Sequence, residues 1–252
     1  MIRVENAVKR YDETVVVDGV SLELAAGGVT AIIGPNGAGK STLLSMVSRL
    51  VGLDAGTVTI DGLDVAKTAG NVLARRLSIL RQDNQMAARL TVGDLVAFGR
   101  YPHSRGRLTR EDARHIDNAL GYMDLGDLRD RFLDELSGGQ RQRAFVAMVL
   151  CQDTDYVLFD EPLNNLDIRH AVAMMRMIRR AADELGKTVV VVLHDINFAS
   201  CHADRIVAMR DGRIFRQGTP EEIIREEVLE ALYGTAFAVS VTAGKRLANY
   251  YL

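Results

Sequence analysis

One segment constrains the fold more than any other: residues 34–41, GPNGAGKS, fit the pattern G-x-x-x-x-G-K-[ST]. The segment follows an apolar stretch, Val29 to Ile33, and precedes apolar residues at helical spacing that stop before Gly52. This order predicts a strand, a glycine-rich loop and a helix. In such a loop, backbone N–H groups and the helix N-terminus bind phosphate, which predicts a nucleotide site. The residues predicted to contact the nucleotide here are Gly34, Pro35, Asn36, Gly37, Ala38, Gly39, Lys40, Ser41 and Thr42.

Roles in this site follow from the chemistry of four residues. Lys40 is predicted to neutralise the terminal phosphates, and Ser41 to ligate Mg²⁺. Asp160 and Glu161 end the apolar run that begins at Tyr156, so Asp160 is predicted to hold Mg²⁺ through water and Glu161 to face the attacking water. Acidic residues also cap helices, which is the alternative for this pair.

A histidine follows another apolar run, Val189 to Leu193. Ligands gather at the carboxyl ends of strands in open parallel sheets, so His194 is predicted to sense or polarise the γ-phosphate. A purely structural histidine is the alternative. A zinc site with Cys201 and His202 is disfavoured, because the spacing matches no common ligand pattern.

Several other segments predict secondary structure. Between about Met86 and Leu150 strand signals vanish, and Thr109 with Asp112 predicts a capping box before a helix that runs through Met123. A further helix is predicted to start at Thr219 and to run to about Leu232. The predicted strands are Thr14–Val17, Val20–Leu24, Val29–Ile33, Val58–Ile60, Leu77–Leu80, Tyr156–Phe159 and Val189–Leu193, the last four in a parallel core sheet.

Charge and composition exclude several classes of protein. The chain of 252 residues has 31 Lys+Arg against 33 Asp+Glu, so no broad basic surface for nucleic acid is expected. Two cysteines suit a reducing compartment. The apolar stretches fall short of the roughly 20 residues that cross a bilayer, and Met1 to Arg10 lacks a signal-peptide core, so a cytosolic chain is expected.

Residues 136–140, LSGGQ, resemble the signature of the ABC ATPase family. Further family elements occur in the expected order. The resemblance makes Tyr11 the aromatic that stacks on adenine, Gln82 the glutamine-loop residue (with Gln85 as the alternative), residues 164–167 the D-loop and His194 the switch histidine. It also implies that ATP bound by a second subunit is contacted by Ser137, Gly138, Gly139, Gln140 and Asp167.

The resemblance implies an α/β fold: a P-loop NTPase core with a mostly parallel sheet, an N-terminal antiparallel β subdomain and an α-helical insertion subdomain. The chain is expected to be one ABC ATPase domain, 1–252, with residues 1–85 and 151–252 as the nucleotide-binding core and about 86–150 as the helical signature subdomain. Two copies would meet head to tail with ATP and Mg²⁺ between them. Lys40, Gln82, Glu161 and His194 would be catalytic, with Gln82 also near Mg²⁺.

Two stretches, Val96 to His103 and His194 to Ser200, look like the ferric-siderophore importer subgroup, and with residues 164–167 most like its catechol-siderophore members. This implies separate membrane permease subunits, an extracytoplasmic siderophore-binding protein and a location at the cytoplasmic face of the membrane. Importers of haem or cobalamin, and a soluble cassette such as an iron–sulfur assembly scaffold, are the alternatives. For the first stretch, the alternative to a permease dock is a solvated loop in which Arg100, Arg105, Arg107 and Arg110 face water.

Overall fold

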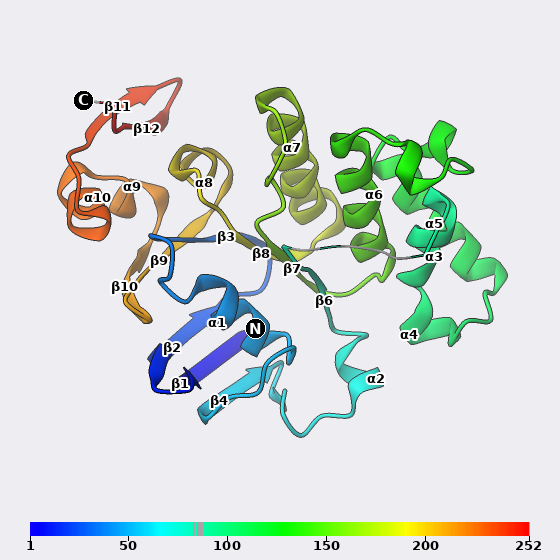
Figure 1. The fold of residues 1–252 in the computed structure, drawn as a ribbon, viewed down its shortest axis with the longest axis horizontal. Helices are drawn as coiled ribbons and strands as arrows, with labels where there is room; N and C mark the ends of the chain where they lie inside the picture. Colours follow the sequence, from blue (N-terminus) through cyan, green and yellow to red (C-terminus); the bar gives the residue numbers. More distant parts are fainter. Residues whose placement is uncertain (83, 85–87, 252) are drawn as a thin grey trace.

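The computed structural model describes residues 1–82, 84 and 88–251 (Figure 1). Gln85 and the expected start of the helical insertion at residue 86 lie outside the described residues. Within them, the central sheet has six strands in the order β10-β9-β3-β8-β7-β6. These strands are β3 (Gly28–Ile33), β6 (Leu77–Leu80), β7 (Tyr156–Asp160), β8 (Thr188–Val192), β9 (Arg205–Arg210) and β10 (Arg213–Gly218). All neighbouring pairs are parallel except β9 with β10.

The sheet confirms the strands that the continuous apolar runs predict. Every residue of β7 and β8 is buried, as expected for parallel strands covered on both faces. Asp160 pairs with Val192 across these two strands. The loops after β3, β7 and β8 therefore leave the same edge of the sheet, which brings Gly34, Glu161 and His194 toward one place.

A second, antiparallel sheet has the order β2-β1-β4-β5. Its strands are β1 (Ile2–Tyr11), β2 (Thr14–Leu24), β4 (Ala55–Ile60) and β5 (Leu63–Asp64). The prediction that Val58–Ile60 joins the parallel core was wrong: β4 pairs with β1 and buries only Val58 and Ile60, a pattern that suits a sheet with one solvated face. The predicted break after Val17 was also wrong, because the pairing with β1 shifts register there and Asp18 and Gly19 stay within β2.

Helices cover the two faces of the central sheet. On one face, α1 (Lys40–Val47) and the antiparallel sheet enclose one apolar core, and on the other the remaining long helices enclose a larger one (Figure 1). The other helices are α2 (Gly70–Leu73), α3 (Val92–Phe98), α4 (Tyr101–Ser104), α5 (Arg110–Tyr122), α6 (Gly138–Cys151), α7 (Ile168–Leu185), α8 (Ile196–His202), α9 (Pro220–Ile223) and α10 (Glu226–Tyr233), with short 3-10 turns at Gly126–Leu128 and Leu133–Glu135. This arrangement confirms the predicted α/β fold class.

Two predicted helix starts can be compared with the structure. The Thr109 capping box precedes α5 as predicted, with the Thr109 N–H and hydroxyl donating to Asp112 Oδ2. At Thr219 the N–H donates to Glu222, but the single helix predicted to reach Leu232 is two helices. The break falls at Ile224, whose ψ of 76° is not helical and ends α9.

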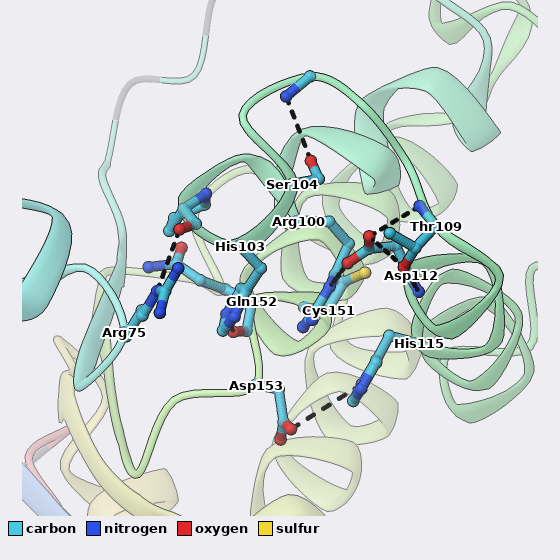
Figure 2. Close-up of polar contacts among 12 residues, drawn as sticks. Arg75, Arg100, His103, Ser104, Thr109, Asp112, His115, Cys151, Gln152 and Asp153 are labelled. Carbon is cyan, nitrogen blue, oxygen red and sulfur yellow. Dashed lines mark hydrogen bonds and ion pairs between the residues drawn. The ribbon is translucent and has the colours of Figure 1, made fainter.

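Arg100 is buried, so the alternative that placed it in water was wrong. It is 4% exposed, between α3 and α4, and Asp112 on α5 is 3% exposed. Figure 2 shows its guanidinium between two partners: Nε donates to Asp112 Oδ1 at 2.9 Å, and Nη1 donates to the carbonyl of Cys151 at 3.0 Å. The N–H of Thr109 foremost, aided by Arg100, holds the pKa of Asp112 down at about 2 although burial opposes this.

Further bonds fix α4 beside the C-terminal end of α6 (Figure 2). His103 Nε2 lies 2.9 Å from the carbonyl of Gln152, and Arg75 Nε donates to the carbonyl of Pro102 at 3.1 Å. The Gln152 amide in turn donates to the carbonyl of Leu77 on β6 at 3.2 Å. Together with Arg100, these contacts form what we call the α4 anchor: Arg75, Arg100, His103, Asp112 and Gln152.

The C-terminal segment forms a hairpin of β11 (Ala238–Thr242) and β12 (Lys245–Asn249). It rests on α8, where the Asn197 amide exchanges two hydrogen bonds with the backbone of Ala248. Ser200 donates to the carbonyl of Arg246. Among the helices in the described part of the chain, none has the length and apolar character required to cross a bilayer.

Candidate nucleotide site

The loop after β3 wraps around the side chain of Lys40. The Lys40 ammonium donates to the carbonyls of Gly34 and Pro35, each at 2.9 Å, and the residue is 5% exposed. Gly39 has a φ of 91°, and a Cβ there would lie 2.5 Å from the carbonyl oxygen of Val16. Only glycine fits this position, because both the backbone conformation and the contact with β2 exclude a side chain.

Asn36 and Gly37 are exposed at the tip of this loop, while Ala38 is buried. Thr42 follows within the first turn of α1. The residues predicted to contact ATP therefore form one continuous loop that opens a helix, which is the arrangement that binds phosphate in glycine-rich loops.

Two carboxylates come together with this loop at the end of β7. Ser41 Oγ donates to Asp160 Oδ1 at 2.7 Å, and Asp160 and Glu161 are each 7% exposed. Glu161 has a left-handed backbone, with a φ of 52°, which is uncommon for a residue with a side chain. Such strain recurs at functional sites.

The Glu161 carboxylate has three side-chain partners. Gln82 Nε2 and Asn164 Nδ2 donate to Oε2 at 2.8 and 2.5 Å, and His194 Nε2 lies 2.5 Å from Oε1. The structure thus joins Gln82, Glu161 and His194, which were predicted separately along the chain. Glu161, Asn164 and His194 also line a cavity of about 260 Å³ that extends to Asp195 and Phe198.

Burial changes the acidity of two groups in this cluster. It lowers the pKa of the Lys40 ammonium, while Glu161 and Asp160 act in the opposite direction. Burial also raises the pKa of Asp160, while the hydroxyl of Ser41 opposes this by donating to the carboxylate. A cation bound beside Asp160 and Glu161 would stabilise the charged form of both carboxylates.

The predicted signature residues begin α6. Ser137 Oγ accepts from the N–H of Gln140 at 3.3 Å, and the Gln140 amide oxygen accepts from the N–H of Ser137 at 3.0 Å. Ser137 and Gly138 are exposed, whereas Gly139 is buried. The helix therefore begins at the surface, at Ser137 and Gly138, although the N–H of Gln140 is already bonded within the cap.

Asp167 and Tyr11 lie apart from the Glu161 cluster. Asp167 caps α7, where its Oδ1 accepts from both the N–H and the ring Nδ1 of His170, each at 2.8 Å. Tyr11 ends β1, is 47% exposed, and has the Lys9 ammonium 5.5 Å from its ring centroid.

The structure places three further side chains in or beside these groups: Asn164 belongs to the predicted D-loop but was given no role toward Glu161, and Gln142 and His170 are not among the predicted residues. Asn164 donates directly to Glu161, Gln142 of α6 donates to the carbonyl of Pro162 at 3.0 Å, and the ring of His170 lies against Gly139. The only sequence signal for them is their position within a few residues of the signature or the D-loop.

Comparisons with known proteins show the family to which the chain belongs. The family model described as ABC transporter matches residues 17–164, and the chain belongs to that family, which confirms the resemblance of the LSGGQ segment.

Two relatives show which kind of ABC protein the chain is similar to. The chain is 51% identical over 251 residues, 100% of both proteins, to the petrobactin import ATP-binding protein YclP of Bacillus subtilis (strain 168). It is 41% identical to the ferric enterobactin transport ATP-binding protein FepC of Escherichia coli (strain K12), covering 92% of this chain and 87% of that protein. Its structure is similar to that of a dimeric bacterial ABC transporter cassette, with a TM-score of 0.78, 28% identity, and coverage of 87% of this chain and 99% of that one.

Proposed function

We propose that the chain is the ATP-hydrolysing subunit of an ABC importer that takes up ferric siderophores. The observation that carries the proposal is the 51% identity to a petrobactin import ATP-binding protein along the whole of both chains. The subunit acts at the cytoplasmic face of the membrane, on separate permease subunits that receive the siderophore from an extracytoplasmic binding protein. Catechol siderophores are the substrate class that the two relatives favour.

Residues 34–42 hold the phosphates of ATP. The N–H groups of the loop and of the α1 N-terminus point to the phosphate oxygens, and Tyr11 stacks on the adenine. Lys40 exchanges its carbonyl partners for phosphate oxygens, and its buried ammonium then has a counter-charge.

Ser41 and Asp160 suit Mg²⁺, because both offer oxygen ligands that meet within 2.7 Å beside Lys40. Gln82 adds a third oxygen ligand, since its amide nitrogen bonds to Glu161 and leaves its carbonyl oxygen available. When bound, Mg²⁺ offsets the charge of the transferred phosphate.

Glu161 orients the attacking water and accepts its proton. Its carboxylate is positioned for this by the bonds from Gln82, Asn164 and His194. His194 also reaches the γ-phosphate, because it follows β8 at the edge of the sheet where the phosphate loop begins.

Two copies of the chain form two composite sites. In each site, Ser137, Gly138, Gly139 and Gln140 of one copy contact the ATP held by the phosphate loop of the other, and Asp167 contacts the partner across the same interface. The support is the exposed N-terminus of α6, together with the similarity to a cassette solved as a dimer. We divide the chain into a nucleotide-binding core, residues 1–85 and 151–252, and a helical subdomain of about 86–150.

The permease contacts the outward surface around α4. Phe98, Tyr101 and Leu108, which are close together in the sequence, are 50%, 61% and 52% exposed, and exposed large apolar side chains favour a protein partner. The hydrogen bonds of the α4 anchor hold α4, which carries Tyr101, against α5 and the C-terminal end of α6.

Uptake of iron-labelled siderophore tests the proposal. Cells that lack the gene would be complemented with the native chain or with Glu161→Gln, with haem and cobalamin uptake as controls. The native chain should restore catechol-siderophore uptake, and Glu161→Gln should not, because it traps ATP in a closed dimer. Uptake that never depended on the gene would refute the transport role, and restored haem or cobalamin uptake alone would reassign the substrate.

A further inference from the structure

His170 lies between the two groups that cross the proposed dimer interface. It is on the first turn of α7, three residues after Asp167, and its ring is directly beside Gly139 of the signature segment. A Cβ at residue 139 would lie 2.6 Å from His170 Cδ2 and 2.9 Å from Cγ, closer than real contacts allow. The ring therefore fills the space that a side chain at residue 139 would need.

Two contacts with the same oxygen of Asp167 fix the orientation of this ring. The N–H of His170 donates to Asp167 Oδ1 as part of the helix cap, and ring Nδ1 lies 2.8 Å from the same oxygen. The N–H of His170 foremost lowers the pKa of Asp167, which keeps this carboxylate charged and available as an acceptor. With the backbone and one ring nitrogen held, the opposite edge of the ring is directed to Gly139.

A second contact joins the same two segments. Gln142, one turn further along α6, donates to the carbonyl of Pro162 next to Glu161. The start of α6 therefore rests on residues 161–170 at two points (α6 and α7 are side by side in Figure 1). These two contacts connect the segment that carries Glu161 to the segment that carries the signature.

We propose that His170 is a positioning residue that sets the signature segment against residues 161–167, so that both meet ATP in register when two copies close. The inference rests on the proposed composite sites, in which Glu161 acts on the ATP of its own chain and the signature on the ATP of the partner. His170 thus links the two sites of the dimer through each chain. It touches no substrate itself.

ATP-dependent dimerisation tests this role in the full chain. In a Glu161→Gln background, His170→Ala should weaken the ATP-dependent dimer about tenfold in sedimentation velocity, and in the native background it should lower kcat about tenfold. Binding of a fluorescent ATP analogue to the monomer should stay unchanged, because the phosphate loop is separate. Arg176→Ala, exposed on the same helix, is the matched control and should behave as native.

A conservative variant separates positioning from helix capping. His170→Asn keeps a donor for Asp167 but lacks the ring that meets Gly139, so it should be as defective as His170→Ala. Native activity and dimerisation of His170→Asn would overturn the proposal. Failure of Glu161→Gln itself to dimerise with ATP would instead contradict the composite sites of the proposed function.

A steric test does not depend on nucleotide. Gly139 lies within α6, where alanine ordinarily stabilises a helix relative to glycine. Gly139→Ala should lower Tm in the native background, because its Cβ meets the ring, and should raise Tm in the His170→Ala background. The same sign of change in both backgrounds would show that the ring does not limit this position, and would overturn the proposal.

Discussion

Removing the guanidinium of Arg100 should destabilise the chain far more than removing any exposed arginine nearby. Arg100→Met leaves the Asp112 carboxylate buried with only its Thr109 bonds, and leaves the carbonyl of Cys151 without a donor. Breaking one side of a buried ion pair costs about 3–5 kcal/mol. Because Asp112 keeps two hydrogen bonds, the expected loss is about 3 kcal/mol, or a Tm lower by roughly 6–12 °C at this chain length.

Urea unfolding, followed by circular dichroism, measures this loss. The matched control is Arg107→Met on the exposed loop after α4, which should change the free energy of unfolding by less than about 0.5 kcal/mol. The double variant Arg100→Met/Asp112→Asn removes the stranded charge as well, so it should be at least as stable as Arg100→Met. The buried ion pair does not have the role described if the stability losses of Arg100→Met and of Asp112→Asn, each measured alone, add up to the loss of the double variant. The same conclusion follows if Arg100→Met is as stable as Arg107→Met.

Two further predictions concern acidic groups. Asn164→Ala should lower kcat about tenfold at unchanged KM for ATP, because Glu161 loses one of two donors to Oε2. Steady-state ATPase rates of the native chain and the variant measure this. An unchanged kcat contradicts the proposed positioning of Glu161 by Asn164. The pKa of Asp112 is lowered to about 2 in the folded chain, so its carboxylate stabilises the fold above about pH 4, and this contribution is lost as the pH falls toward 2. The urea midpoints of the native chain and Asp112→Asn should therefore converge with acidification, and a constant difference between pH 6 and pH 3 would count against the lowered pKa.

The central sheet and the phosphate site could be predicted because their signals are local. Strands buried on both faces leave continuous apolar runs such as Val189 to Leu193, and parallel strands bring their carboxyl ends to one edge. Glu161 and His194 could therefore be placed beside the phosphate loop without knowledge of the contacts between them. The antiparallel sheet was harder, since β4 alternates weakly and its partner β1 precedes it by about fifty residues.

Other features depend on contacts that no local pattern records. Arg100 is a charged residue at the end of an apolar segment, and its burial depends on two partners far along the chain, the carboxylate of Asp112 and the carbonyl of Cys151. The bond from Asn164 to Glu161 depends on the left-handed backbone of Glu161, which a sequence does not reveal for a residue with a side chain. The place of His170 follows from the packing of α7 on α6, and from glycine at residue 139, which leaves room for the ring.

The α4 anchor separates residues that hold the helix from residues that face outward. Arg100 and His103 point inward to carbonyls at the end of α6, whereas Phe98 and Tyr101 are exposed and take no part in those bonds. On the proposed docking surface, the outward residues can therefore change without breaking the α4 anchor, which connects through α6 to the signature some 21 Å away. A change of permease partner then requires few substitutions, at exposed residues from the end of α3 through α4 and the loop that follows it.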